Sequence, residues 1–327
     1  MSGFRAYRVH EAGKPGRLER VSRGELDHGN VVVRTAYAGL NYKDALTATG
    51  RAGMARKFPL VCGTDLSGAV ESSEDPRWHP GDEVLIHSFG LGAEHDGGFA
   101  ELGRFPADWI FPLPAGLSLL EAAALGVAGH SVAVALELLE KNGLRPGDGR
   151  VLVNGATGGV GSIAIDVLSR LGYHVVALTG KADRAGYLRE LGAAEILDRA
   201  SMELGARPLE EQLWAAAFDS VGSAQLGWLL RTARRDGLVA SIGNAGGNEF
   251  AGNVLPFILR GVRLIGINVN NPVAAKLRIW RRLATDWKPP HFERFVRCIG
   301  LDELPRAFDE LLAGRCWGRQ VLDLGKG

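Results

Sequence analysis

The stretch GRVLVNGATGGVGSIAIDVLSRLGYHVVALTGK, residues 149–181, decides the fold. A continuous apolar strand, VLVNG, runs into a glycine-rich turn, and a helical pattern of about twelve residues follows it. A second apolar strand, HVVALTG, completes the unit. Two such strands joined by one helix over about thirty residues predict a βαβ unit, with parallel strands and a right-handed crossover.

The turn in this unit reads Gly155-Ala156-Thr157-Gly158-Gly159-Val160-Gly161. It follows a strand and opens a helix inside a βαβ unit, which is the context of a dinucleotide-binding fingerprint. Ala156 replaces a glycine of the common form. The glycines would let the backbone approach a pyrophosphate, whose charge the helix N-terminus stabilises. A tight turn that binds nothing is the alternative.

The residues at the end of the second strand distinguish proteins that bind NAD from proteins that bind NADP. Enzymes that use NAD place an acidic residue there, to hold the ribose hydroxyls. This chain has Thr179-Gly180-Lys181, with Arg184 just beyond. Lys181 and Arg184 would pair with a 2′-phosphate, so the sequence favours NADPH. The alternative is that both are ordinary solvated charges at a helix start.

Composition excludes several classes of protein. The 327 residues suggest about two domains. Lys and Arg number 38 and Asp and Glu 37, a net charge of +1 that argues against nucleic acid as a partner. Cys62, Cys298 and Cys316 stand far apart, which excludes a disulfide framework and the common structural zinc patterns. The first residues lack a signal pattern and no apolar run reaches about 18 residues, so we expect a cytoplasmic protein without a membrane segment.

The two halves of the chain differ in pattern. Up to about residue 120, short apolar segments such as 30–40, 65–75 and 82–90 end in turn formers and predict an irregular, mostly β domain. Ser118 and Glu121 then have the spacing of a capping box at the start of a helix. Strands and helices alternate beyond residue 181. Helices are expected at 183–193, 223–237, 279–287 and 303–314. Strands are expected at 195–200, 215–222, 262–270 and 319–324, and a strand and loop at 237–247.

Several segments together carry a family resemblance. They are LNYKDAL (40–46), FPLVCGTDLSGAV (58–70), SSEDPRWHPGDEV (72–84), RPLEEQLWAAAFDSVG (207–222) and LPFILRGVRLIGI (255–267). With the fingerprint, they resemble the medium-chain dehydrogenase/reductase superfamily, and within it the acrylyl-CoA reductase and quinone oxidoreductase branch. The resemblance implies an α/β protein and a homodimer. Its parts would be a GroES-like, mostly β catalytic domain (1–122), a Rossmann NADP-binding domain (123–262) and a C-terminal return to the catalytic domain (263–327).

The resemblance also implies a reductase without metal. Zinc alcohol dehydrogenases of this superfamily bind catalytic zinc through a Cys and a His, and the matching positions here are Asn41 and Thr64. His87, His95 and Asp96 could be imagined as ligands, but we interpret them as a polar loop at the cleft mouth. Residues matched to cofactor contacts are Tyr42, Thr157, Gly158, Gly159, Val160, Thr179, Gly180, Lys181, Arg199, Asn244, Ile258 and Arg319. Arg199 would assist Lys181 and Arg184 at the 2′-phosphate or adenine end; the alternative is an exposed strand-end arginine.

Without a metal, hydride is best delivered to an already electrophilic carbon. We therefore expect an enoyl thioester of the acrylyl-CoA type as substrate, with a quinone as the alternative. Tyr42 beside Asn41 is the best candidate to donate a hydrogen bond to the developing enolate oxygen. Tyr42 could instead only pack on the nicotinamide and Asn41 only fix the loop, with solvent or a ribose hydroxyl as donor.

Three segments depart from the acrylyl-CoA reductase pattern. They are residues 88–98, 126–131 and 266–270. These departures argue against acrylyl-CoA itself as the substrate, but they do not argue against a reductase. Arg51, Arg56 and Lys57 could receive CoA phosphates, or form a solvated loop. A non-catalytic NADPH-binding protein of the same fold is the alternative of another class.

Overall fold

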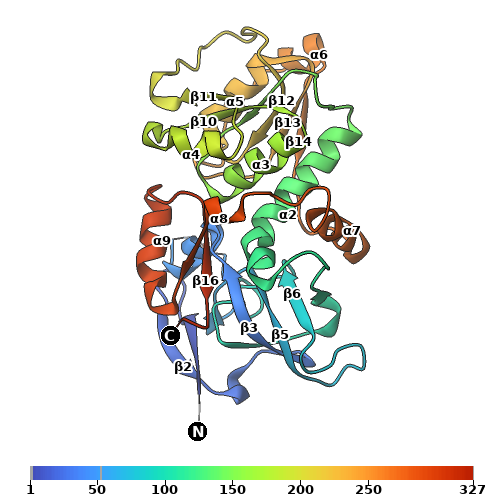
Figure 1. The fold of residues 1–327 in the computed structure, drawn as a ribbon. Helices are drawn as coiled ribbons and strands as arrows, with labels where there is room; N and C mark the ends of the chain where they lie inside the picture. The colour runs from blue at the N-terminus through green and yellow to red at the C-terminus, as the bar shows by residue number, and fades with distance from the viewer. Residues whose placement is uncertain (1–2, 52–53, 327) are drawn as a thin grey trace. The chain divides into compact units, whose positions relative to one another are not determined.

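Two units make up residues 3–51 and 54–326, the part of the chain that the computed structural model describes (Figure 1). The β-rich unit comprises the residues up to 128, residues 272–284 and the residues from 296 onward. The parallel-sheet unit comprises residues 129–271 and 285–295. Helix α2 (Leu119–Lys141) contributes to both units.

The β-rich unit contains two sheets. One has the strand order β15-β16-β3-β5-β6-β8, with β7 also paired to β3, and the other has the order β2-β1-β4. The strands are β1 (Phe4–Val9), β2 (Arg17–Val21), β3 (Val31–Gly39), β4 (Leu60–Val61), β5 (Asp65–Ser73), β6 (Glu83–His87), β7 (Leu102–Phe105), β8 (Phe111–Pro112), β15 (Val296–Ile299) and β16 (Arg319–Asp323). The helices are α1 (Tyr42–Ala48), α7 (Val273–Leu283) and α9 (Leu304–Leu312), with 3-10 turns η1 (Arg23–Glu25), η2 (Ala107–Trp109) and η5 (Leu301–Glu303).

The parallel-sheet unit has the strand order β11-β10-β9-β12-β13-β14, and every neighbouring pair is parallel. This order, 3-2-1-4-5-6 in chain sequence, is that of a doubly wound dinucleotide-binding sheet. The strands are β9 (Arg150–Val153), β10 (His174–Thr179), β11 (Glu195–Asp198), β12 (Trp214–Asp219), β13 (Ala233–Ser241) and β14 (Arg263–Gly266). The helices are α3 (Gly159–Arg170), α4 (Ala185–Glu190), α5 (Ser223–Thr232), α6 (Leu255–Arg260) and α8 (Phe292–Phe295), with turns η3 (Ala182–Arg184) and η4 (Arg199–Ser201).

Helix α2 is long and apolar, and it is interrupted near its start. Gly126 has φ 41° and ψ −140°, outside the helical region. Ser118 and Glu121 form the predicted capping box, with mutual bonds of 2.8 to 3.2 Å. By length and composition α2 could cross a membrane, but 78% of its most apolar window is buried inside the structure. That burial is typical of a core helix.

Two expectations from the sequence are corrected. The helix expected over 223–237 ends at Thr232, because Ala233–Ser241 forms strand β13 beside β12 and β14. The C-terminal return does not begin at residue 263, because β14 pairs with β13 in the parallel sheet. Residues 285–295 also belong to the parallel-sheet unit, where the His291 ring bonds Asp166 at 2.7 Å.

Candidate active site

Asn41 lies between strand β3 and helix α1, where it serves as the N-cap of the helix. Its backbone N–H donates to Asp44 Oδ2 at 2.8 Å, which fixes the first turn. Its side-chain amide nitrogen lies 3.0 Å from each of three acceptors, on Asp44, Thr64 and Asp65. The two amide hydrogens are therefore shared among oxygens on α1 and near the start of β5. We call Asn41, Asp44, Thr64, Asp65 and Arg319 the Asn41 cluster.

Arg319, the first residue of β16, is the cation of this cluster and is 2% exposed. Its Nη1 donates to Asn41 Oδ1 at 3.0 Å, and its Nη2 to Asp65 Oδ2 at 3.3 Å. The same guanidinium donates to the carbonyl oxygens of Leu40 and Ala124 at 2.5 and 2.9 Å. Arg319 thus joins β16, α1, β5 and the start of α2, and its expected cofactor contact stays a prediction.

The two carboxyl groups of the cluster differ in environment. Asp65 accepts the backbone N–H groups of Gly39 and Val127 at 2.7 and 2.9 Å, in addition to the Arg319 guanidinium. Asp44 is buried, and its hydrogen-bond donors are neutral groups of Asn41 and Thr64. Burial, reinforced by repulsion from Asp65, raises the pKa of Asp44 to about 7. Asp44 is therefore partly protonated near neutral pH.

The cluster does not fit a catalytic zinc ion. Zinc in this kind of site is held by thiolate, imidazole or carboxylate ligands. At the two positions matched to the Cys and His ligands, this chain has an amide and a hydroxyl, Asn41 and Thr64, which bond each other at 3.0 Å. The Arg319 guanidinium already brings a positive charge to Asn41 Oδ1. The donor set at this place therefore supports chemistry by hydrogen bonds and fixed charge, and no step here is assigned to zinc.

Tyr42 follows Asn41 as the first residue of α1, and its side chain is half-buried. The capping bonds between Asn41 and Asp44 fix the helix start at which Tyr42 lies. Lys43 beside it is exposed.

The glycine-rich turn of the parallel-sheet unit is built for close backbone contact. It connects β9 to α3, with Gly158 as the N-cap of α3. Gly155 has φ 56°, and a Cβ on Gly161 would lie 2.5 Å from the Gly155 oxygen, so neither position accepts a side chain without strain. The first N–H groups of α3, at Gly159 and Val160, have no acceptor one turn earlier within the helix. They can donate hydrogen bonds to the oxygens of a phosphate.

Cationic groups gather at the end of β10. Lys181 Nζ donates to Thr157 Oγ1 at 3.3 Å, linking the strand end to the glycine-rich turn. The guanidinium of Arg199 lies over Gly180, where a Cβ would be 2.7 Å from Arg199 Nη2. Arg184 Nε lies 3.2 Å from its neighbour Asp183. Lys181 and Arg199 thus flank the predicted place of a 2′-phosphate.

The remaining predicted contacts lie elsewhere in the same unit. Asn244 is exposed on the loop after β13, and its side-chain amide donates to Asn248. Ile258 is on α6 and 70% exposed. Their contacts with a cofactor stay predictions.

The interpretation of His87, His95 and Asp96 as a polar loop at the cleft mouth is wrong, because all three are buried. His87 Nε2 accepts the indole N–H of Trp280 at 2.9 Å. Asp96 Oδ1 accepts the Val61 N–H at 2.9 Å. These groups hold the loop to the core of the β-rich unit.

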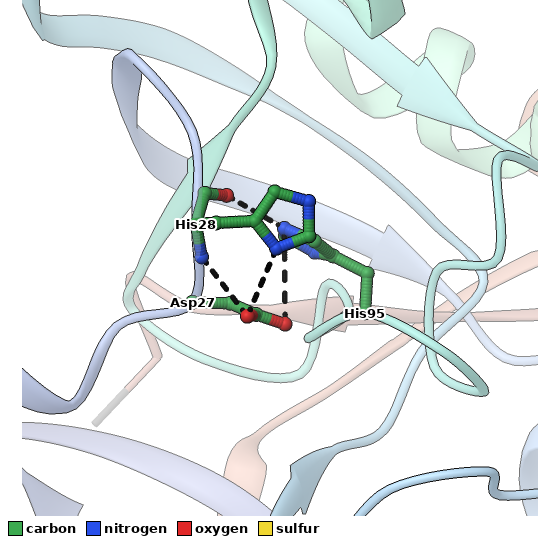
Figure 2. A group of neighbouring side chains, drawn as sticks. All are labelled: Asp27, His28 and His95. Carbon is green, nitrogen blue, oxygen red and sulfur yellow. Dashed lines mark hydrogen bonds and ion pairs between the residues drawn. The ribbon is translucent and has the colours of Figure 1, made fainter.

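His95 belongs to a cluster with Asp27 and His28 that sequence reasoning missed (Figure 2). Its Nε2 and Nδ1 lie 2.8 and 2.9 Å from two backbone carbonyl oxygens, those of His28 and Asp96. The Asp27 carboxylate bonds Lys57 Nζ and the His28 N–H. Burial opposes ionisation, but Lys57 and these N–H groups hold the pKa of Asp27 well below its ordinary value. The side chains are therefore hydrogen-bonded to one another and to the backbone.

Two family models match the chain, and three proteins illustrate its similarity to known ones. The models are the alcohol dehydrogenase GroES-like domain, at residues 27–115, and the zinc-binding dehydrogenase, at residues 159–285. The acrylyl-CoA reductase AcuI of Ruegeria pomeroyi is 42% identical, over 96% of either chain. YhfP of Bacillus subtilis, named as a quinone oxidoreductase, is 43% identical over 94% of either chain.

Solved structures agree with this grouping. The yhdH oxidoreductase from Salmonella enterica, in complex with NADP, superposes with a TM-score of 0.93 at 40% identity, over 99% of this chain and 100% of its own. Bacillus subtilis yhfP with NAD bound gives a TM-score of 0.94 at 40% identity, with the same coverage. The fold, the fingerprint and these similarities show that the chain belongs to the medium-chain dehydrogenase/reductase superfamily, in its zinc-free quinone oxidoreductase and acrylyl-CoA reductase branch.

Proposed function

We propose that this protein is an NADPH-dependent, metal-independent reductase that transfers hydride to an activated double bond. An enoyl thioester of the acrylyl-CoA type is the first candidate substrate. The observation that carries the proposal is the pairing of the glycine-rich turn with Lys181 and Arg199 at the end of β10. The related yhdH oxidoreductase is solved in complex with NADP, and AcuI is named as an acrylyl-CoA reductase.

Six of the predicted site residues have a physical task in this reaction. When bound, NADPH supplies the hydride. The N–H groups of Gly159 and Val160 would bind its pyrophosphate, while Lys181 and Arg199 pair with the 2′-phosphate. Asn41 holds the start of α1, and Tyr42 would place its hydroxyl at the substrate oxygen or its ring against the nicotinamide. The α-carbon of the substrate would take its proton from solvent.

Initial-rate NADPH oxidation tests the proposal directly, with acrylyl-CoA beside phenanthrenequinone as hydride acceptors. Saturation by acrylyl-CoA at low concentration supports the thioester reductase. Turnover of the quinone alone supports the second candidate, which the altered loop at 88–98 and the similarity to YhfP favour. NADPH binding without turnover on any activated alkene would contradict the enzyme and favour a non-catalytic binding protein.

The preference for NADPH needs its own test, because yhfP is solved with NAD. Replacing Arg199 by Gln should raise the KM for NADPH about tenfold and leave that for NADH unchanged, since only NADPH carries the 2′-phosphate. Arg207→Gln is the matched control, because Arg207 is an exposed arginine of the same unit that pairs with Glu210. Equal rates with NADPH and NADH in the wild type would contradict the roles of Lys181 and Arg199.

We further infer a homodimer and a cytoplasmic location. Five apolar side chains lie exposed around helix α6: Phe250, Val254, Phe257, Ile258 and Leu259. Strand β14 follows directly and is an edge of the parallel sheet. An apolar patch beside a free strand edge favours pairing with a second copy. Cys62, Cys298 and Cys316 form no disulfide within the described part of the chain, as expected in a reducing compartment.

A further inference from the structure

Lys276 on helix α7 is a buried ammonium without a hydrogen-bond partner among the described residues. Lys276 is only 1% exposed to solvent. A buried charge that lacks hydrogen bonds is costly, so such a group is either neutral or awaits a partner. Burial lowers the pKa of Lys276 to about 8, so the group still carries its charge at neutral pH.

The surroundings of Lys276 stabilise a cation without satisfying its N–H groups. Its Nζ lies 4.3 Å from the centroid of the Phe89 ring, within the range of a cation–π contact. That ring is held in place by Trp109, on which it stacks at 5.4 Å and 5°. An aromatic face accepts no conventional hydrogen bond from the ammonium, so its donors remain available.

The backbone that presents Phe89 is strained. Ser88 and Phe89 have φ of 71° and 51°, in the left-handed region that non-glycine residues seldom adopt. Backbone strain of this kind clusters at functional sites. The strained segment also lies in 88–98, one of the three segments that depart from the acrylyl-CoA reductase pattern.

Lys276 is connected to the Asn41 cluster within the β-rich unit. The Ser88 N–H donates to the carbonyl oxygen of Thr64 at 3.3 Å, and Thr64 bonds Asn41. His87 pairs with Asp65 across strands β5 and β6. Trp280, one helical turn beyond Lys276, bonds His87 at 2.9 Å. Helix α7 is therefore anchored to the strand that adjoins the cluster, with the ammonium one turn away.

We propose that Lys276 binds the carbonyl oxygen of the hydride acceptor and stabilises the charge that develops there. This inference rests on the proposed function. Hydride from NADPH adds to the β-carbon, which leaves NADP⁺. The π electrons of the C=C bond then form the enolate, whose oxygen accepts a hydrogen bond from the Lys276 ammonium. The α-carbon takes a proton from water as the carbonyl re-forms. A quinone would place its developing phenolate oxygen at the same donor.

The test compares Lys276→Met, which keeps the length of the side chain without its charge, with Lys276→Arg. Stabilisation of a developing charge predicts that K276M lowers kcat about 10²- to 10³-fold, with a much smaller change in the KM of the acceptor. K276R should recover part of that loss. The affinity for NADPH, followed by fluorescence titration, should not change. The melting temperature of K276M should equal or exceed that of the wild type, because an unsatisfied buried charge is removed.

Lys288→Met is the matched control. Lys288 also lies over an aromatic ring, 5.8 Å from the Phe292 centroid, but in the parallel-sheet unit. K288M should keep the wild-type kcat. Wild-type kcat in K276M would overturn the proposal. A rise in the KM for acrylyl-CoA with unchanged kcat would also overturn it, because Lys276 would then pair with a charge that the substrate already carries, such as a CoA phosphate. Absence of turnover in the wild type with every acceptor would instead contradict the proposed function itself.

Discussion

At the residue scale, Arg319 neutralises Asp65 in the interior of the β-rich unit. Removing one partner of a buried pair leaves an uncompensated charge, at a cost of about 3–5 kcal/mol. Arg319→Met should therefore lower the free energy of unfolding by about that amount, because Asp65 and the carbonyls of Leu40 and Ala124 lose their donor. Urea unfolding at constant pH measures this.

Arg306→Met provides the comparison for that measurement. Arg306 pairs with Glu310 on the surface of α9, where its side chain is 84% exposed. Exposed pairs of this kind contribute little to stability. Asp65→Asn combined with R319M should restore part of the lost stability, since it removes the stranded charge. Equal effects of R319M and R306M would show that the Asn41 cluster does not depend on its cation.

Asp44 gives the β-rich unit a pH dependence of a particular sign. Its folded-state pKa of about 7 lies above the ordinary value, so the folded state binds the proton more tightly than the unfolded chain. This contribution to stability is complete below about pH 4 and is lost as the pH rises through 7. The free energy of unfolding should thus fall between about pH 5 and pH 8 in the wild type and fall less in Asp44→Asn.

Asp75→Asn serves as the control, because Arg77 lowers the pKa of Asp75 to about 2 through side-chain and backbone hydrogen bonds. Such a depressed carboxyl contributes fully above its unfolded pKa and loses its contribution only as the pH falls through about 2. D75N should therefore shift stability equally at about pH 5 and pH 8. A D44N variant with the full wild-type pH dependence would show that another group titrates.

The cluster partners also show where sequence reasoning stops at this scale. Asn41, Tyr42 and Lys181 stand in local motifs, so they could be singled out from the sequence. Asp65 and Arg319 are 254 positions apart and meet only because β16 pairs with β3, which pairs with β5. No local pattern encodes such a contact, and the same holds for Lys276 over Phe89.

At the element scale, the break in α2 at Gly126 leaves room for the Asp65 carboxylate. A Cβ on Gly126 would lie 2.4 Å from Asp65 Oδ2, and its φ of 41° adds strain for any other residue. Gly126→Ala should therefore displace Asp65 from the Val127 N–H and destabilise the unit by about 3 kcal/mol or more. Thermal unfolding of the purified variant checks this.

Gly13→Ala separates backbone strain from collision. Gly13 has φ +76° in the same unit, and a Cβ there would meet nothing within 4 Å. It should cost about 1 kcal/mol, the strain alone. If G126A and G13A are equally destabilising, the Asp65 carboxylate can move away without loss and the break in α2 has another cause.

Elements with strong periodicity could be predicted from the sequence, and those set by pairing could not. The βαβ unit at 149–181 matches β9, α3 and β10, because its apolar runs and glycine turn are all local signals. The segment ARRDG at 233–237 carries helix formers directly after α5, which favours a continued helix. Of this segment only Ala233 pairs with β12, the ladders that join β13 to β12 and β14 run from Leu238 onward, and Asp236 has φ 58°, outside the helical region.

At the scale of the whole molecule, the exposed apolar patch around α6 carries the last prediction. Val254 and Leu259 are 65% and 52% exposed, yet both are large aliphatic side chains in one short segment beside the edge strand β14. An isologous dimer would bury this patch on both copies and extend the sheet across the twofold axis. Leu259→Asp places two like charges at that interface, so the variant should run at half the wild-type mass in light scattering coupled to gel filtration. Val273→Asp, an aspartate at a 41% exposed valine of the β-rich unit, should keep the wild-type mass. A wild-type protein with the mass of one chain, or an L259D variant that stays dimeric, would show that the α6 patch is not a dimer interface.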